Sequence, residues 1–576
     1  MSPAELKSRS HLPWLLFALL AVTVTVLFRP GGLPLINPDE GRNAEVAREM
    51  KESGSWLVPT YNGLPYLDKP AFYFKTVALS LAVFGDNELG ARIPSALFAL
   101  GVLGLTGWIT RRDVGARPAA LAVLVVTTLP LFLSQARIVI FDMALAFFVC
   151  LSILAGFVAE SPGNARRRTW YLVGAAAAGC ATLVKGPVGF VLPLLVLASY
   201  HVLERRWDAL RRLLHPLHVL VVILVVLPWF LGVSREHPDF PAYGLVEESF
   251  KRFTTRQFRR TAPPYYYLVV LPVTFLPWSL LIPGAALPAL RQWRSLPAIS
   301  RLSIVWSLSV VTFFSLSQSK LPGYILSVTV PFGILVSQLI ERAMRHPAGR
   351  SARLLRGAAM ALAITALLLA VALVIVAPQT GLLARPLVIP RVDLNRFLPH
   401  LTAVLVMLLC VGCANAASVW RRTVGGAVIS IAALPLLLIV LGRGVFREVF
   451  ESRSAVRMAA QIRQLPEGTE LVFLRCFPAG LPFYLRRTGT LVTTDGSELT
   501  SNYIEYALKR TTDWPSPVVR LDDFEEWLAA RKAPVYLMVQ DNERDRFLAL
   551  ADARAIPVDE YPRRFRGMLL PPRRGF

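Results

Sequence analysis

The sequence predicts a mainly α-helical, polytopic membrane protein with about 13 transmembrane helices, outer juxtamembrane helices and a small C-terminal α/β domain. Of the 576 residues, 54% are hydrophobic and only 17% are charged, whereas soluble domains have about 25% charged residues. The mean hydropathy is +0.50, and apolar runs close to the length that spans a bilayer recur along the chain. A change to mixed composition after residue 442 predicts the C-terminal domain.

The positive-inside rule orients the predicted helices. Lys7 and Arg9 precede the first run, which places the N-terminus in the cytoplasm, and the loops that then face the cytoplasm are basic. These loops carry most of the net charge of +24, so we expect no nucleic-acid partner. The predicted spans are residues 12–28, 93–110, 118–133, 139–158, 170–184, 188–201, 217–233, 265–287, 302–317, 324–340, 357–377, 398–418 and 424–441.

The apolar run at residues 71–85 is too short for a straightforward crossing, because about 20 residues are needed. If it crossed, the basic loop at residues 111–117 would lie outside and the charge rule would fail in most later loops. We therefore predict a juxtamembrane helix at the outer surface. The predicted transmembrane domain is residues 1–442, with outer loops at 29–92 and 234–264.

Residues 443–576 are predicted to form a soluble domain on the periplasmic side. Within it, residues 470–477 and 535–539 are predicted strands, and residues 522–531 and 543–553 are predicted helices. Four of the five cysteines lie in apolar runs, so no disulfide framework follows. Cys410 and Cys413 have the spacing of metal ligands, but without a second pair or a nearby histidine they are interpreted as packing residues.

The polar stretch at residues 29–70 interrupts two apolar regions and is the predicted centre of the chemistry. Asp39 and Glu40 stand side by side at its centre, Arg42 follows in a helix-like run, and Asp68 and Lys69 close the stretch. Carboxylates beside cations at a bilayer surface suggest a reaction on a phosphate-bearing lipid. A plainer interpretation makes Arg42 the salt-bridge partner of Glu40.

Three further charged residues fall near the ends of predicted spans, on the outer face. Ionisable groups at such positions are costly unless they pair or have a function. Asp142 is a site candidate or the partner of Arg137, whereas Lys185 and Lys320 are site candidates or side chains that extend to the interface. The outer loop at residues 247–260 is basic against the charge rule, which is either tolerated or marks an anion site for lipid phosphates.

Several motifs in this order resemble the bacterial aminoarabinose transferases that modify lipid A, and more broadly the GT-C polyprenyl-phosphate glycosyltransferases that include the protein O-mannosyltransferases. The resemblance covers about residues 12–340, and YLRRTGTLVTT at residues 484–494 is similar to the periplasmic module of that family. The motifs are NPDEGRNAEVAREM, YLDKPAFYF, FDMALAFF, KGPVGFVLP and KLPGYIL.

The resemblance implies an inverting transfer of 4-amino-4-deoxy-L-arabinose, or a similar sugar, from undecaprenyl phosphate to lipid A or another envelope acceptor. It places the reaction at the periplasmic face of the bacterial inner membrane. Asp39 would be the principal catalytic carboxylate, with Glu40 and Asp142 as further acidic residues. The residues expected to hold the donor or its phosphate are Arg42, Tyr66, Asp68, Lys69, Lys185, Arg252, Lys320 and Tyr324.

Two departures from the family pattern affect the expected site. Asp68 precedes Lys69 where relatives often have glutamate, and Ser249 follows Glu248 where they often have histidine. Since a metal in some relatives would depend on that glutamate and histidine, we expect no metal and no required cofactor here.

The residues fit the reaction independently of the resemblance. Cleavage of a glycosyl–phosphate bond builds positive charge on the sugar and negative charge on the leaving phosphate, which carboxylates and cations respectively stabilise. A phosphate acceptor needs no strong base, whereas a hydroxyl acceptor does, so the acceptor stays open. Two other classes were weighed: a transporter or flippase for a lipid-linked sugar, whose charges would line a path across the bilayer, and a membrane scaffold.

Overall fold

The computed structural model describes residues 11–251, 254–255, 261–284, 293–376, 398–540, 556–558 and 565–571. The chain divides into two compact units. The first unit contains residues 1–30, 95–230 and 249–445, and the second contains residues 31–94, 231–248 and 446–576. The second unit thus joins the C-terminal residues to parts of both predicted outer loops. The predicted boundary at residue 442 stays a prediction.

The first unit is helical. Its elements are α2 (Leu12–Val22), the π-helix η1 (Thr23–Leu27), α5 (Glu88–Asp113), α6 (Ala116–Thr127), α7 (Pro130–Gln135), α8 (Asp142–Ala159), α9 (Arg167–Lys185), α10 (Val188–Leu203), α11 (Trp207–Leu213), α12 (Pro216–Glu236), α15 (Tyr266–Thr274), the 3₁₀ helices η3 (Trp278–Leu281), η4 (Trp293–Ser295) and η5 (Pro322–Val328), α17 (Ala298–Leu316), α18 (Thr329–Arg345), α19 (Arg350–Val376), α21 (Leu398–Trp420) and α22 (Val424–Leu441). Helices α5 and α12 extend into the second unit.

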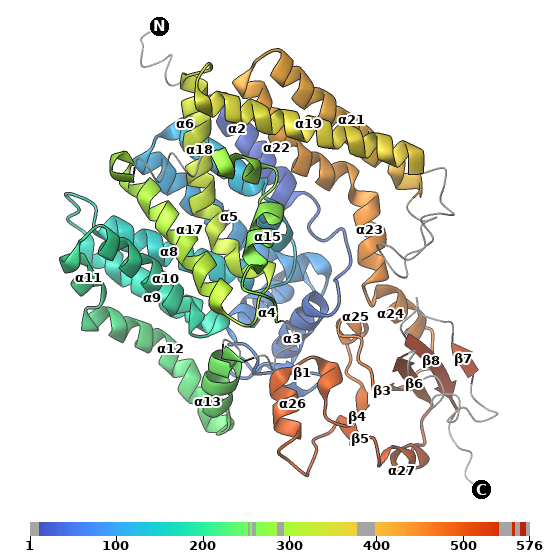
Figure 1. The fold of residues 1–576 in the computed structure, drawn as a ribbon. Helices are drawn as coiled ribbons and strands as arrows, with labels where there is room; N and C mark the ends of the chain where they lie inside the picture. Colours follow the sequence, from blue (N-terminus) through green and yellow to red (C-terminus); the bar gives the residue numbers. More distant parts are fainter. Residues whose placement is uncertain are drawn as a thin grey trace. The chain divides into compact units, whose positions relative to one another are not determined.

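Two packed groups of helices are prominent in the first unit. Helices α8, α9 and α10 pack against one another, and α19 packs against α21 and α22 (Figure 1). Within the described residues, eight helices are long and apolar enough to span a membrane, or nine if one bent pair is a single span. Four further apolar helices are shorter. The many apolar helices confirm the predicted class, while the count of thirteen spans stays a prediction.

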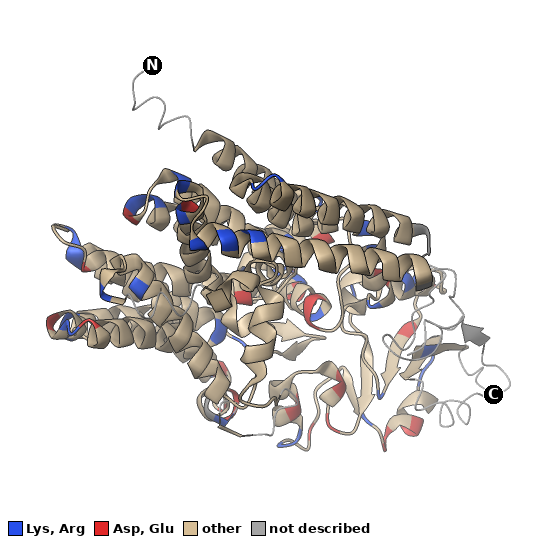
Figure 2. Cartoon of the chain, turned by 45° about the horizontal axis from the view of Figure 1, so that its top comes forward, with Lys and Arg blue, Asp and Glu red and all other residues tan. Residues whose placement is uncertain are grey.

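Charged residues stand mainly near the ends of the long helices of the first unit (Figure 2). The start of α19 shows this, since Arg350 and Arg353 lie in its first turns. The predicted span that begins at residue 357 starts later than the helix itself, because α19 begins at Arg350. A helix continues through arginines readily, because arginine has a high helix propensity, so a hydropathy boundary does not mark its start.

The predicted eighth span, residues 265–287, stays a prediction, because its described part is not one straight helix. The structure instead has α15 and a second short helix at Trp278–Gly284, bent by 112° at the break. Pro277 lies in this break and Pro272 inside α15 just before it, and each lacks the N–H that would continue the helical ladder. The third predicted span, residues 118–133, is also divided, since α6 ends at Thr127 and Pro130 begins α7.

The second unit combines helices with two sheets. Its elements are α3 (Asp39–Ser53), β1 (Thr60–Tyr61), β2 (Leu64–Pro65), α4 (Phe72–Phe84), α13 (Phe240–Ala242), the π-helix η2 (Tyr243–Lys251), α23 (Arg443–Ser452), α24 (Val456–Ile462), β3 (Glu470–Leu474), α25 (Leu481–Leu485), β4 (Thr490–Thr493), the 3₁₀ helix η8 (Ser497–Leu499), α26 (Asn502–Leu508), β5 (Val518–Arg520), α27 (Phe524–Ala529), β6 (Val535–Gln540), β7 (Ile556–Val558) and β8 (Phe565–Leu570). Of these, η2 and α23 also have residues in the first unit.

The predicted juxtamembrane segment at residues 71–85 is the helix α4, which packs against α3. The larger sheet has the strand order β5-β4-β3-β6-β8-β7. Strands β3, β4, β5 and β6 are parallel, and β8 is antiparallel to β6 and β7. Its core is apolar, with Val472, Val492 and Leu537 fully buried.

The two predicted strands are confirmed as β3 and β6, and the predicted helix at residues 522–531 is the shorter α27. The predicted helix at residues 543–553 lies outside the described residues. The other strands of the large sheet were not predicted. Strand β5 has only three residues, too few for a period-two pattern to be recognised.

Candidate functional site

The first turn of α3 places Asp39 and Arg42 together. The two residues are three apart, the spacing that puts side chains on one face of a helix, and Arg42 Nη2 lies 2.6 Å from Asp39 Oδ1. The Asp39 side chain is 42% exposed, whereas that of Arg42 is only 8% exposed. Asp39 is therefore a carboxylate that a ligand can reach, fixed by a buried cation.

The remaining contacts of Arg42 fix the plane of its guanidinium group. Its Nη1 donates to the carbonyl oxygen of Thr500 at 2.9 Å and to the Thr500 hydroxyl at 2.7 Å. The ring of Tyr66 lies 5.8 Å from Cζ. Burial lowers the pKa of Arg42, but Tyr66 and Asp39 outweigh it and hold the pKa above its ordinary value. The buried Nε donates to no acceptor within the described residues.

Asp68 and Lys69 lie in the connection between β2 and α4, and their side chains have different partners. Asp68 Oδ1 accepts from the Tyr243 hydroxyl and from the backbone N–H of Tyr503, each at 2.7 Å, and Oδ2 accepts from the N–H of Asn502 at 3.1 Å. Lys69 is paired with Glu248 and also donates to the carbonyl oxygen of Asp68 at 2.6 Å. Asp68 thus accepts from three protein donors, and its predicted role at the donor phosphate stays a prediction.

Glu40, predicted as a further catalytic acid, lies in different surroundings from Asp39, and its role stays a prediction. Its carboxylate is 4% exposed and accepts from Arg92 at 2.6 and 2.9 Å and from the Ile36 N–H at 2.9 Å. Successive helical residues point about 100° apart, so Glu40 faces the interior while its neighbour Asp39 remains accessible. The suggested salt bridge between Arg42 and Glu40 is also wrong, because Arg42 pairs with Asp39 instead.

A second group of predicted residues lies in the first unit. Asp142 is the first residue of α8, and it pairs with Lys185, the last residue of α9. Both positions are favourable in the field of the helix, where anions are stabilised at the N-terminus and cations at the C-terminus. Lys185 Nζ also lies 4.4 Å from the centre of the Tyr324 ring, a cation–π contact.

The loop between α9 and α10 explains why Lys185 stands at this place. Gly186 ends α9 with a φ of +79°, a left-handed conformation that favours glycine. A Cβ on Gly189 would lie 2.2 Å from the backbone of Ala181, so α10 contacts α9 closely. The suggested Asp142–Arg137 pair is not formed, since Arg137 donates to the carbonyl oxygens of Thr25 and Phe28.

Lys320 makes its hydrogen bonds outside both groups, and its predicted role at the donor stays a prediction. Its side chain is buried and donates to the carbonyl oxygens of Ala262, at 2.9 Å, and Ser317. Burial lowers its pKa. The Lys320 side chain therefore contacts the residue that follows α17 and does not extend to the membrane interface. Arg252, the last predicted phosphate ligand, lies outside the described residues together with much of the predicted anion-binding loop.

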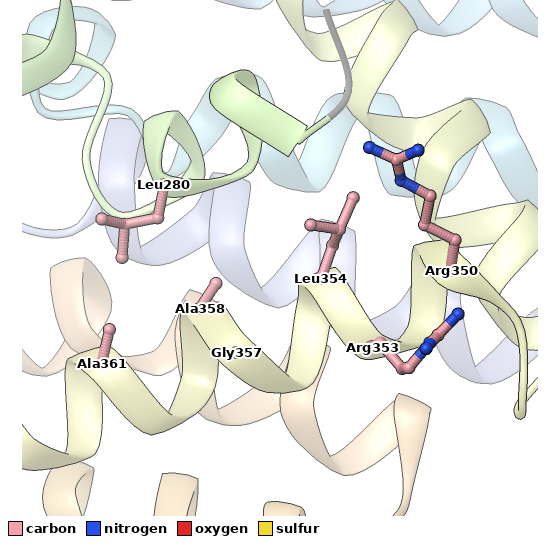
Figure 3. A pocket seen from close by; sticks show the side chains of 7 residues that line it. All are labelled: Leu280, Arg350, Arg353, Leu354, Gly357, Ala358 and Ala361. Atoms are coloured by element: carbon pink, nitrogen blue, oxygen red, sulfur yellow. The ribbon is translucent and has the colours of Figure 1, made fainter. Parts of the chain in front are cut away.

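A hollow of about 590 Å³ lies elsewhere in the first unit, between η3 and the start of α19 (Figure 3). Arg350 and Arg353 stand at one end, and Leu280, Leu354 and Ala361 give it an apolar lining. It contains none of the predicted site residues. Across the part of the chain that the structure describes, no group of three or more His, Cys, Asp or Glu side chains is arranged to hold a metal ion. The expectation that no metal is required stays a prediction.

The structure therefore gathers the predicted residues into two groups, one in each unit. The group of the second unit also includes Tyr243, Glu248, Thr500 and Asn502, which the predicted site set omitted. Only Glu248 had a sequence signal, since it is an acidic residue within the basic outer loop. Thr500 and Asn502 are ordinary polar residues, and only folding brings them to Arg42 and Asp68.

Comparison with known proteins finds related sequences and folds. Residues 38–243 match the family of dolichyl-phosphate-mannose-protein mannosyltransferases. Two curated relatives are undecaprenyl phosphate-alpha-4-amino-4-deoxy-L-arabinose arabinosyl transferases. That of Edwardsiella ictaluri is 32% identical over 57% of this chain, and that of Pseudomonas fluorescens is 35% identical over 55%. The matched regions span 59% and 54% of the lengths of these relatives.

A solved structure matches over nearly the whole length. It is the crystal structure of ArnT from Cupriavidus metallidurans bound to undecaprenyl phosphate, with 28% sequence identity and a TM-score of 0.81. The match covers 96% of this chain and 97% of that one. The predicted fold class and the family resemblance are thereby confirmed.

Proposed function

We propose that this chain is a GT-C glycosyltransferase related to the aminoarabinose transferases and protein mannosyltransferases. It transfers 4-amino-4-deoxy-L-arabinose, or a similar sugar, from undecaprenyl phosphate to lipid A or another envelope acceptor. The transfer takes place at the periplasmic face of the inner membrane and inverts the anomeric centre. The observation that carries the proposal is the near full-length match to a protein crystallised with undecaprenyl phosphate.

In the proposed reaction, Asp39 acts at the sugar. Its accessible carboxylate stabilises the positive charge that develops at the anomeric carbon as the bond to the phosphate breaks. If the acceptor is a hydroxyl, the same carboxylate takes its proton. An acceptor phosphate arrives ionised and attacks without this step.

The leaving undecaprenyl phosphate gains negative charge, which nearby cations stabilise. Arg42 supplies a positive charge next to Asp39, and its raised pKa keeps the guanidinium charged. Lys69 provides a second positive charge in the same unit, moderated by Glu248. In the first unit we assign Lys185 and Tyr324, held by Asp142, to binding of the lipid-linked donor.

The test uses the purified full-length protein in lipid nanodiscs with undecaprenyl-phosphate-linked 4-amino-4-deoxy-L-arabinose and lipid A. Mass spectrometry is expected to show lipid A that has gained the sugar. Asp39→Asn is expected to lower the rate about a hundredfold or more, since it removes the carboxylate charge at the reacting centre. Asp208→Asn is the matched control, because its side chain is 80% exposed on α11. An Asp39→Asn variant as fast as the control would contradict the role of Asp39.

The match to the mannosyltransferase family favours one second candidate, a transferase with a protein hydroxyl as acceptor. The same assay separates the two when serine- and threonine-containing peptides replace lipid A and polyprenyl-phosphate mannose is the donor. Glycosylated peptide without modified lipid A would select this candidate. Movement of the donor across the bilayer without transfer to either acceptor would instead select the flippase.

A further inference from the structure

The segment at residues 500–503 joins η8 to α26 and contacts the charged side chains of the second unit. Thr500 has a φ of +54°, a left-handed conformation that L-residues other than glycine rarely adopt. In this conformation its carbonyl oxygen and its hydroxyl both accept from Nη1 of Arg42. The left-handed conformation of Thr500 thus directs both its carbonyl oxygen and its hydroxyl at Nη1 of Arg42.

Asn502 and Tyr503 contact the carboxylates of the same group. The backbone N–H groups of Asn502 and Tyr503, in the first turn of α26, donate to the two oxygens of Asp68. The side-chain Nδ2 of Asn502 lies 3.3 Å from Glu248 Oε2, and Glu248 is the partner of Lys69. Three residues of this segment, Thr500, Asn502 and Tyr503, thus contact Arg42, Asp68 and Glu248.

The contacts leave Arg42 with a defined orientation. A guanidinium group is planar, so two acceptors on Nη1 and one on Nη2 fix the direction of every N–H. With Thr500 at Nη1 and Asp39 at Nη2, the Nε–H and the second N–H of Nη2 are the donors that remain. A small rotation of the plane would redirect these N–H groups and would also change the distance to Asp39.

We infer that residues 500–503 form a clamp by which the C-terminal region positions Arg42 and Lys69 for the phosphate of the donor. The inference rests on the proposed function for the identity of that phosphate. Thr500 is a positioning residue, because it acts through Arg42 and not on the substrate. The clamp gives the C-terminal region a part in catalysis: it orients a transition-state contact of the enzyme.

The kinetic test compares Thr500→Val, which removes the hydroxyl and keeps the branched shape, with Thr500→Ser, which retains the hydroxyl. The control is Thr512→Val, the same change at an exposed threonine. In nanodiscs with the aminoarabinose donor, Thr500→Val is expected to lower kcat about tenfold, as the loss of about 1.4 kcal/mol of transition-state stabilisation does. Thr500→Ser and the control are expected to retain the wild-type kcat. A Thr500→Val kcat equal to that of the control overturns the clamp.

A second measurement does not depend on transfer. Hydrogen exchange of the Asn502 and Tyr503 amides is expected to speed up in Asp68→Ala and to stay unchanged in Asp513→Ala, an exposed aspartate. Unchanged exchange in Asp68→Ala overturns the clamp. If the wild-type protein transfers no sugar while exchange responds as expected, the proposed function fails and the positioning contacts stand.

Discussion

The paired charges of this protein differ in how far they are exposed, and exposure decides their roles. Asp39 is the accessible member of its pair, whereas Asp142 and Lys185 have side chains only 5% and 12% exposed. A buried ion pair contributes little net stability, but removal of one partner leaves a buried charge uncompensated. The two pairs therefore call for different experiments.

Lys185→Met is expected to destabilise the protein by about 3–5 kcal/mol, because it leaves the Asp142 carboxylate buried without its cation. The double variant Asp142→Asn, Lys185→Met is expected to regain most of this loss. The measurement is the apparent unfolding temperature in detergent, compared with donor turnover. A double variant that folds and transfers normally would show that the pair is structural only.

Removal of divalent metals is expected to leave transfer unchanged. Lys69 is paired with Glu248, so the positive charge that a metal would bring is already supplied by a side chain. The measurement is the transfer rate after dialysis against a chelator, with and without added Zn²⁺, Mg²⁺ or Mn²⁺. A rate that is lost on dialysis and restored by one metal would contradict this expectation.

At the scale of the element, α3 carries further charged contacts besides the pair of Asp39 and Arg42. Glu45 lies against Arg48 at 2.6 and 2.7 Å, and Arg48 also pairs with Glu52. Glu49 accepts from Thr60, Asn62 and Gly63 and so holds the turn between β1 and β2. One helix thus fixes the site at its first turn and supports the neighbouring hairpin at its last turns.

Burial raises the pKa of Glu45 to about 8, although Arg48 opposes the shift. Because the folded protein then binds this proton more tightly than the unfolded chain, the free energy of unfolding falls as pH rises from about 4.5 to about 8. Glu45→Gln is expected to flatten this dependence. The measurement is the apparent unfolding temperature across that pH range, and an equally steep profile in the variant would contradict the assignment.

At the scale of the whole molecule, the orientation in the membrane follows from the distribution of lysine and arginine. The test places single cysteines at Ser53, Glu525 and Asp208 in a background without the five native cysteines. A membrane-impermeant maleimide is expected to label Ser53→Cys and Glu525→Cys in intact spheroplasts, and Asp208→Cys only after lysis. Labelling of Asp208→Cys in intact spheroplasts would reverse the predicted orientation.

The second unit combines segments that lie far apart in the sequence, which the predicted domain organisation had separated. The predicted outer loop that contains α3 and the C-terminal sheet belong to one compact unit. Asn62 shows the connection, since its side chain donates to the carbonyl of Gly489 and accepts from the Gly489 N–H. A boundary drawn from composition alone separates these segments, because composition changes along the chain and contacts form in space.

The sequence by itself determined the helical membrane class, most helix positions, two strands and the residue types of the site. These properties depend on local pattern: apolar runs, charges at run ends, and the i, i+3 spacing that joins Asp39 to Arg42. Only the tertiary structure decided the distant partners. It placed Arg92 on Glu40, Lys185 on Asp142 and Thr500 on Arg42. Such pairs depend on how whole elements pack, and residues far apart in the chain carry no local signal of the side chain they will meet.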